Sequence, residues 1–361
     1  MIRFDNFQVQ YRSLKKDIDG AIGRVLARGW FILGKEVARF EEEFAAYIGT
    51  RYAVGVASGT EAIALSLMVL DIGPGCEVIT TAMTAFPTIT GILQAGAKPV
   101  VVDICEETGL IDVEQIEAKI NKRTAAIVPV HLYGQSCDME RIETIAGKYR
   151  LPVVEDCAQS CGTTYEARRT GSLGRCGVFS FYPTKNLGAY GDAGAVTTND
   201  QRLDGKLRRL RNYGQSDRYR HERFGLNSRL DEIQAALLRV KLKHLDAWNG
   251  KRRDIAASYR RRLRAVTCLR ENPGSASNHH LFVVKSPARD RLLAHLLAHG
   301  VQALIHYPIP VHRQRAFPGQ KRETLPASER FSRMVLSLPI YPELSERNLS
   351  RIIQVVNAFT V

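Results

Sequence analysis

The sequence contains no apolar run approaching the roughly 18 residues that a membrane-spanning helix requires. Its first residues lack the hydrophobic region of a secretory signal. It also lacks internal repeats and low-complexity tracts, and hydrophobic residues make up 45% of its 361 residues. These absences argue against a membrane protein, an exported protein and a disordered chain. We therefore expect a soluble, cytoplasmic, globular protein with no membrane partner.

Paired cysteines are also missing. The seven cysteines are an odd number, and no two stand at the two-residue gap of a zinc knuckle or a redox dithiol. We therefore expect reduced thiols and no metal site.

Negative charge is scarce, because 51 Lys and Arg outnumber 37 Asp and Glu and give a net charge of +14. Residues 202–264 alone hold 19 basic against seven acidic side chains. A nucleic-acid surface is one interpretation of this segment. Solvated helices with a few arginines facing an anionic small molecule are the other, and the composition leaves both open.

Short β-branched runs alternate with helical patterns from Tyr52 onward, which is typical of parallel sheets. The predicted strands are 52–56, 77–80, 98–103, 125–130, 151–156, 177–181 and 194–198, and the predicted helices between them are 60–70, 88–94, 113–120 and 139–149. The fold class predicted is α/β, with a mostly parallel seven-stranded sheet sandwiched by helices.

The pattern changes after Gln201 to long helices, including 231–245 and 253–263. A smaller α+β unit follows, with a strand at 281–284 and helices at 289–299 and 349–359. We predict a large domain over residues 1–248, with an N-terminal helical arm, and a small C-terminal domain over 249–361.

Three features stand where parallel strands end, at the sheet edge where ligands bind. Gly59 and Thr60 open a helix, whose free N–H groups suit a phosphate; Asp156 ends the fifth strand; Lys185 follows the sixth. Each alone is commonly structural, as a helix cap, a buried ion pair or a loop lysine. Together they match what pyridoxal phosphate requires: an anchor for its phosphate, a carboxylate for its ring nitrogen and a lysine for its aldehyde.

Three segments extend this reading to a family. Residues 59–62 read GTEA, residues 155–159 read EDCAQ, and residues 180–188 read SFYPTKNLG. With GLNSRLDEIQAA at 225–236 and HYPIP at 306–310, they resemble the DegT/DnrJ/EryC1/StrS family of sugar aminotransferases, which have the aspartate aminotransferase fold (fold type I). The resemblance runs from about Trp30 to the C-terminus.

The resemblance implies a role for each matching residue. Lys185 would be the Schiff-base lysine and Asp156 the partner of the pyridine nitrogen, and these two are the predicted catalytic residues. Gln159 would pack by the cofactor ring. Gly59, Thr60 and Ser180 would bind the phosphate. Asn227 matches the asparagine that family members lend to the phosphate from the neighbouring subunit, which implies a homodimer with shared active sites.

One position departs from the family pattern. Where members commonly carry an aromatic residue that stacks on the cofactor, this chain has Ala85, with Phe86 beside it. Phe86 is therefore a candidate for the stacking role. The presence of Lys185 argues against the dehydratase branch, in which histidine replaces the lysine.

The reaction implied is transfer of an amino group from L-glutamate to a nucleotide-linked keto-deoxysugar. The sequence around Lys185 is more similar to that of family members that act on 3-keto-6-deoxyhexoses. Members that act on 4-keto sugars or keto-inositols are the alternatives. Arg220, Arg229, His306 and Tyr307 are candidates for substrate binding. A DNA-binding or regulatory protein that keeps the fold is the alternative outside enzymes, and no helix-turn-helix or zinc-finger signature supports it.

Overall fold

The computed structural model describes residues 1–318 and 323–360. It begins with two helices, α1 (Phe7–Arg28) and α2 (Lys35–Ile48). The buried residues of α1, at positions 14, 18, 21 and 25, form one stripe at helical spacing. Both helices pack against α8 (Glu232–Leu242), and α2 also contacts the first strand. These two helices span the residues for which the sequence predicts an N-terminal helical arm.

Seven strands form the central sheet. They are β1 (Tyr52–Val56), β2 (Glu77–Thr81), β3 (Lys98–Val102), β4 (Thr124–Val128), β5 (Val154–Asp156), β8 (Cys176–Ser180) and β9 (Gly194–Thr198). One sheet has the order β1-β9-β8-β5 and the other β3-β2-β4, and parallel bridges from Ile127 to Val153 and from Val130 to Asp156 join them. Only β9 runs against its neighbours in this sheet. The predicted mostly parallel seven-stranded sheet is confirmed.

Side chains alternate between two apolar layers along the strands. In β1, Val54 and Val56 enter the layer beneath α3 (Gly59–Val69), whereas Ala53 enters the layer beneath α2 and α8. Both faces of the sheet are therefore covered. The other helices before residue 211 are α4 (Phe86–Gln94), α5 (Ile116–Lys119), α6 (Met139–Tyr149) and α7 (Gln201–Leu210), with 3-10 turns η1 (Val113–Gln115) and η2 (Leu132–Gly134).

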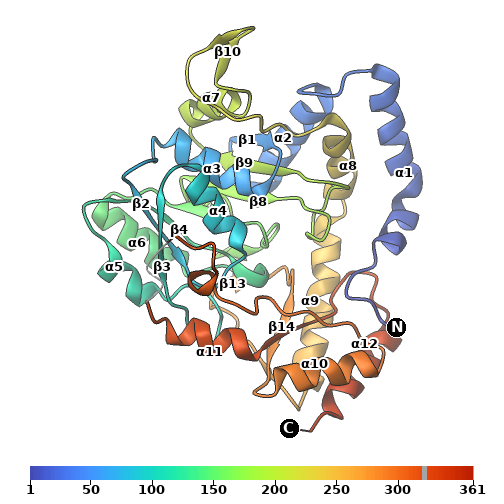
Figure 1. The fold of residues 1–361 in the computed structure, drawn as a ribbon. Helices are drawn as coiled ribbons and strands as arrows, with labels where there is room; N and C mark the ends of the chain where they lie inside the picture. The colour runs from blue at the N-terminus through green and yellow to red at the C-terminus, as the bar shows by residue number, and fades with distance from the viewer. Residues whose placement is uncertain (319–322, 361) are drawn as a thin grey trace.

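The segment between α7 and α8 is not helical. It forms a hairpin of β10 (Gln215–Asp217) and β11 (Arg220–His221), which projects from the top of the molecule in Figure 1. A methyl group on Gly214 would lie 1.8 Å from the Arg223 carbonyl oxygen, and one on Gly225 would lie 2.2 Å from the Gly214 nitrogen, so both positions require glycine. The prediction of long helices after Gln201 is therefore correct for α7, α8 and α9 (Leu245–Arg262) and wrong for the residues between α7 and α8.

The C-terminal elements lie at the bottom of Figure 1. A three-stranded antiparallel sheet of β12 (Thr267–Cys268), β14 (Phe282–Lys285) and β15 (Val335–Leu338) packs with α10 (Arg289–Ala298), α11 (Pro326–Met334) and α12 (Glu346–Asn357). A second small sheet joins β6 (Thr164–Tyr165), β7 (Arg168–Arg169) and β13 (Ser275–Ala276), and η3 spans Val311–Arg313. Helix α9 runs continuously across the predicted domain boundary at 248/249.

Two general expectations can be compared with the structure. All seven cysteines are free. Among the described residues, no helix is long and apolar enough to cross a membrane.

Candidate active site

A cavity of about 290 Å³ lies at the edge of the sheet where β5 and β8 end. The segments that follow β1, β2, β5 and β8 all contribute to its wall. The lining residues are Ser58, Gly59, Thr60, Ile63, Thr84, Ala85, Pro87, Thr88, Val130, Asp156, Ala158, Gln159, Ser180, Tyr182, Lys185, Asp192 and Ala193. Six of the predicted site residues, from Gly59 to Lys185, are therefore brought together in one wall.

One end of the cavity is suited to an anion. Ser58 caps α3 by accepting a hydrogen bond from the Glu61 N–H at 3.2 Å, and the first N–H groups of a helix have no acceptor within it. The Thr60 and Ser180 side chains belong to the same wall. A methyl group on Gly59 would fall 2.7 Å from Ser180 Cβ, so only glycine lets these two segments meet here. Backbone N–H groups, hydroxyls and the positive end of α3 together fit a phosphate group.

The carboxylate of Asp156 lies buried at the end of β5. One oxygen accepts from Thr88 Oγ1 at 2.8 Å and the other from the Ala158 N–H at 3.1 Å. Burial raises the pKa of Asp156, while these hydrogen bonds and the charge of Lys185 act in the opposite direction. The bonds fix the plane of the carboxylate and leave lone pairs on both oxygens for a further donor in the cavity.

Lys185 sits on a tight turn after β8. The Lys185 N–H donates to the Tyr182 carbonyl at 2.8 Å, and the Ala189 N–H donates to the Phe181 carbonyl at 2.7 Å. Gly188 closes the turn, since a methyl group there would lie 2.3 Å from the Pro183 carbonyl oxygen. Burial lowers the pKa of Lys185 to about 8, and the negative charge of Asp156 opposes this. The amine is therefore far easier to deprotonate than that of an exposed lysine.

Gln159, in the segment after β5, contacts the HYPIP segment. Its Oε1 accepts from the Tyr133 N–H at 2.7 Å, and its Nε2 donates to the Tyr307 hydroxyl at 3.0 Å. Tyr133 in turn donates its hydroxyl hydrogen to the His306 carbonyl at 2.5 Å. His306 and Tyr307 therefore lie behind Gln159 and are not part of the cavity wall.

Both residues of this pair have shifted pKa values. Burial and the nearby positive charge of Lys185 lower the pKa of His306 to about 4, so its ring is neutral near pH 7. Burial raises the pKa of Tyr307 to about 12. At neutral pH, the pair therefore offers uncharged hydrogen-bonding groups next to the site.

The remaining predicted residues do not reach the cavity of their own chain. Asn227 is exposed and pairs with Asn212 in an isolated bridge. Arg220 is exposed on the hairpin, and Arg229 donates to the Asn212 side chain at 3.1 Å. Phe86 packs against an apolar cluster that includes Val311 and lies outside the wall, whereas Ala85 lines it.

Several wall residues were not among those predicted. Thr84 precedes α4 and Thr88 lies in its first turn, and their hydroxyls are hydrogen-bonded at 2.9 Å. The spacing TxxxT just after a predicted strand was the available signal. Tyr182 and Asp192 flank the Lys185 turn and line the cavity as exposed side chains. Nothing in the local pattern separates them from ordinary loop residues.

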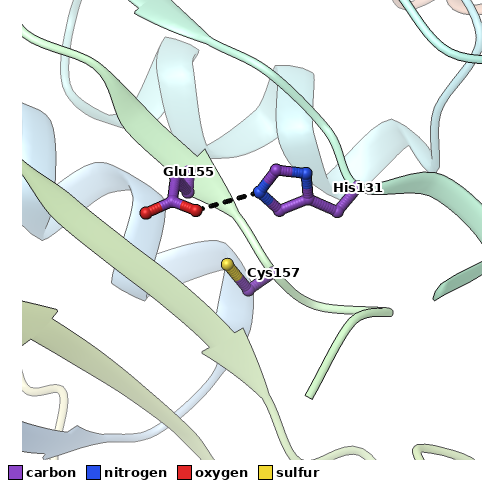
Figure 2. A group of neighbouring side chains, drawn as sticks. All are labelled: His131, Glu155 and Cys157. Carbon is purple, nitrogen blue, oxygen red and sulfur yellow. Dashed lines mark hydrogen bonds and ion pairs between the residues drawn. The ribbon is translucent and has the colours of Figure 1, made fainter. Parts of the chain in front are cut away.

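Figure 2 shows a second group of potential ligands, His131, Glu155 and Cys157, all buried. His131 Nδ1 accepts from the Cys137 N–H, so Nε2 carries the hydrogen and donates to Glu155 at 3.0 Å. Glu155 also accepts from three N–H groups of the loop 171–174 at 2.7 to 2.8 Å. Burial raises the pKa of Cys157 well above its ordinary value, which disfavours a thiolate. The group therefore anchors the loop 171–174 to β5 and offers a metal no free lone pair on the imidazole.

Comparisons with known proteins place this geometry among aminotransferases. A sequence profile of the DegT/DnrJ/EryC1/StrS aminotransferase family matches residues 12–357. The chain is 46% identical to dTDP-3-amino-3,6-dideoxy-alpha-D-galactopyranose transaminase of Aneurinibacillus thermoaerophilus, over 99% of both chains. It is 44% identical to dTDP-3-amino-3,4,6-trideoxy-alpha-D-glucose transaminase of Streptomyces venezuelae, over 98% of this chain and 95% of that protein. It is also 43% identical to a pleiotropic regulatory protein of Geobacillus stearothermophilus, over 97% and 96%.

Solved structures give the same result. The crystal structure of S. venezuelae DesV in complex with a ketimine intermediate matches with a TM-score of 0.96 and 44% identity, over 99% of this chain and 97% of that one. The structure of NtdA from Bacillus subtilis with bound cofactor PMP matches with a TM-score of 0.89 and 31% identity, over 95% and 81%.

Proposed function

The chain belongs to the DegT/DnrJ/EryC1/StrS aminotransferase family, and on that premise we propose that it transfers an amino group to C-3 of a nucleotide-linked 3-keto-6-deoxyhexose. The observation that carries the proposal is the wall that joins Lys185, Asp156 and the start of α3. The position of the amino group is supported by the names of two relatives, both of which specify a 3-amino sugar.

Pyridoxal phosphate fits the wall, and when bound it supplies the electron sink and the carrier of the amino group. The N–H groups at the start of α3, with Thr60 and Ser180, would hold the phosphate. Asp156 would accept a hydrogen bond from the ring nitrogen and keep it protonated. Lys185 would hold the cofactor through its amine.

Lys185 has a second task when its amine is free, because it can move a proton at the carbon that exchanges the amino group. A pKa of about 8 places this amine close to neutral pH, where a general base is most effective. A methionine at this position would lose both tasks, and an arginine would keep only the charge.

We further propose a homodimer in which each subunit completes the other's site. Asn227 and Arg220 are exposed and do not line the cavity of their own chain, which a role in the partner's site would explain. Large exposed aromatic side chains are the kind that a second subunit would cover, and Trp30 is 59% exposed, Tyr219 80% and Phe224 82%. Arg229, in the same segment, would act with them, and L-glutamate is the proposed amino donor.

Subunit mixing tests the shared site. The variants Lys185→Ala and Asn227→Ala should each lose most activity as homodimers. In a refolded mixture, each heterodimer carries one intact site, so activity should recover to about a quarter of the unmodified level. Failure of the mixture to recover, with dimers present, would place Asn227 in its own subunit's site or in none.

A substrate panel tests the reaction. The purified protein, loaded with pyridoxal phosphate and supplied with L-glutamate, is assayed with 3-keto and 4-keto nucleotide sugars and a keto-inositol, and products are identified by mass and NMR. We expect turnover of the 3-keto compounds. Turnover of 4-keto sugars or keto-inositol alone would contradict the proposed position.

The basic segment gives the DNA-binding alternative little support. Among the described residues, many of its cations are already held in ion pairs: Lys206, Arg208, Arg209, Arg211, Arg223, Arg239, Arg260 and Arg262. A visible absorbance band that borohydride removes, and that Lys185→Ala lacks, would support the enzyme. A colourless protein that binds DNA would refute it. The seven free thiols support a cytoplasmic location.

A further inference from the structure

A second lysine, Lys241, is buried near the end of α8 and has no part in the chemistry above. Its side chain is 1% exposed, and its Nζ donates to the Gly188 carbonyl at 2.6 Å. The same Nζ lies 3.9 Å from the centre of the Tyr190 ring. Within residues 1–318 and 323–360, no carboxylate forms an ion pair with it. A carbonyl and an aromatic face therefore provide the compensation that a buried ammonium needs.

Both partners of Lys241 belong to the turn that carries Lys185. Gly188 is three residues beyond Lys185, and a methyl group on Gly188 would lie 3.2 Å from the Lys185 carbonyl oxygen. Gln234 lies two helical turns before Lys241 on the same face of α8, and its Oε1 accepts from the Tyr190 N–H at 2.8 Å. Helix α8 therefore holds the turn at two points.

We propose that Lys241 is a positioning residue for Lys185. The Lys241 ammonium holds the turn 183–190, so that the amine of Lys185 faces the cofactor. This inference rests on the proposed function, because it assigns Lys241 a task only if Lys185 holds pyridoxal phosphate. Lys241 is not itself a residue of the cavity wall.

The strength of this contact depends on charge. A hydrogen bond from an ammonium is stronger than one from a neutral amine, and attraction to an aromatic face requires the positive charge. Burial lowers the pKa of Lys241 to about 7, while the charge of Glu343 from the C-terminal region opposes this. Lys241 Nζ lies over the Tyr190 ring, and the charges of Tyr11 and Asp19 of α1 act on Tyr190, with the Tyr11 ring centre 6.4 Å from that of Tyr190. The hold on the turn should therefore weaken as the pH rises through about 7.

The test compares Lys241→Met with Lys243→Met in the full-length protein loaded with pyridoxal phosphate. Lys243 is exposed at the end of the same helix and serves as the matched control. The first readout is the rate at which the cofactor is released into buffer that contains a reagent that captures free pyridoxal phosphate. The others are the pH dependence of that rate and the thermal unfolding temperature of the cofactor-free protein. We expect Lys241→Met to release the cofactor on the order of tenfold faster at pH 6.5.

The pH profile separates positioning from a general loss of stability. Release from the unmodified protein should accelerate between about pH 6 and 8, whereas Lys241→Met should lack that component. Because Lys241→Met could impair folding, Tyr190→Leu provides a second perturbation at a side chain that is 37% exposed. It should also speed release, and Tyr190→Phe, which keeps the ring, should restore the original rate.

The inference is overturned if Lys241→Met and Lys243→Met release the cofactor at the same rate, or if release from Lys241→Met keeps the pH dependence of the unmodified protein. It is also overturned if Tyr190→Leu and Tyr190→Phe behave alike. If the unmodified protein shows no visible band with pyridoxal phosphate, the proposed function fails instead, and the two failures are distinguished by that first measurement.

Discussion

Replacing Lys185 by methionine should make the cofactor-free protein more stable at neutral pH while abolishing its proposed activity. Lys185 must carry a charge in a partly buried place below about pH 8, whereas the same lysine in the unfolded chain is solvated. Burial lowers the pKa of Lys185 from 10.5 to about 8 in the folded protein, although the negative charge of Asp156 raises it. The difference corresponds to about 3 kcal/mol of lost stability, or about 2 kcal/mol if partial solvent contact screens it.

The sign of the pH dependence follows from the same shift. Below about pH 8 both the folded and the unfolded lysine are protonated, so the whole cost is present. Between about 8 and 10.5 the folded protein binds fewer protons, so stability rises with pH. Above that range both forms are neutral and the cost disappears. The advantage of Lys185→Met should therefore be greatest at pH 7 and shrink toward pH 10.

The assay is urea unfolding of the cofactor-free protein at pH 7, 8.5 and 10, followed by tryptophan fluorescence. Unmodified protein, Lys185→Met and Lys243→Met are compared, and Lys243→Met should match the unmodified protein at each pH because its side chain is exposed. The reasoning is refuted if Lys185→Met gains nothing at pH 7. It is equally refuted if the gain is the same at pH 7 and pH 10.

Three further outcomes are expected. Asp156→Asn should lower kcat/KM by on the order of a hundred- to a thousandfold, because the amide no longer keeps the ring nitrogen protonated; steady-state kinetics measures this, and near-normal activity would contradict the role. Gly59→Ala should weaken cofactor binding about tenfold in an absorbance titration, since the added methyl would lie 2.7 Å from Ser180 Cβ, whereas Gly205→Ala on α7, with open space around it, should not. Glu232→Ala should destabilise the protein by about 3 kcal/mol in urea, because the buried carboxylate accepts three N–H groups at the start of α2, and an unchanged midpoint would refute that capping role.

The fold class was accessible from the sequence because the pattern of the strands reflects burial on both faces. Runs such as Glu77–Thr81 and Gly194–Thr198 are buried at every position, and such runs separated by helices favour a mostly parallel sheet. The direction of β9 was not accessible in the same way, since an antiparallel strand buried on both sides has the same composition. Family, reaction class and cofactor followed from the motifs and are confirmed by the comparisons.

The candidate site was accessible only where residue type and strand end coincide. Asp156 and Lys185 stand at such points, and the structure brings them to one cavity. Arg211 illustrates the opposite case: it lies in the basic segment but is 6% exposed and paired with Glu41, so it is not available to a ligand. Arg211 and Glu41 are 170 residues apart in the sequence, so the residues that surround Arg211 in the sequence do not show that it is paired. The assigned roles of the site residues and the domain boundary remain predictions.

Every residue that lines the cavity lies between Ser58 and Ala193. From the last third of the chain, Tyr307 contacts the wall residue Gln159 without lining the cavity itself. The wall is therefore built from one continuous stretch of the polypeptide, which ends before α7. Substitutions after α9 therefore leave the side chains of the wall in place, and they act on it through contacts such as that of Tyr307 with Gln159.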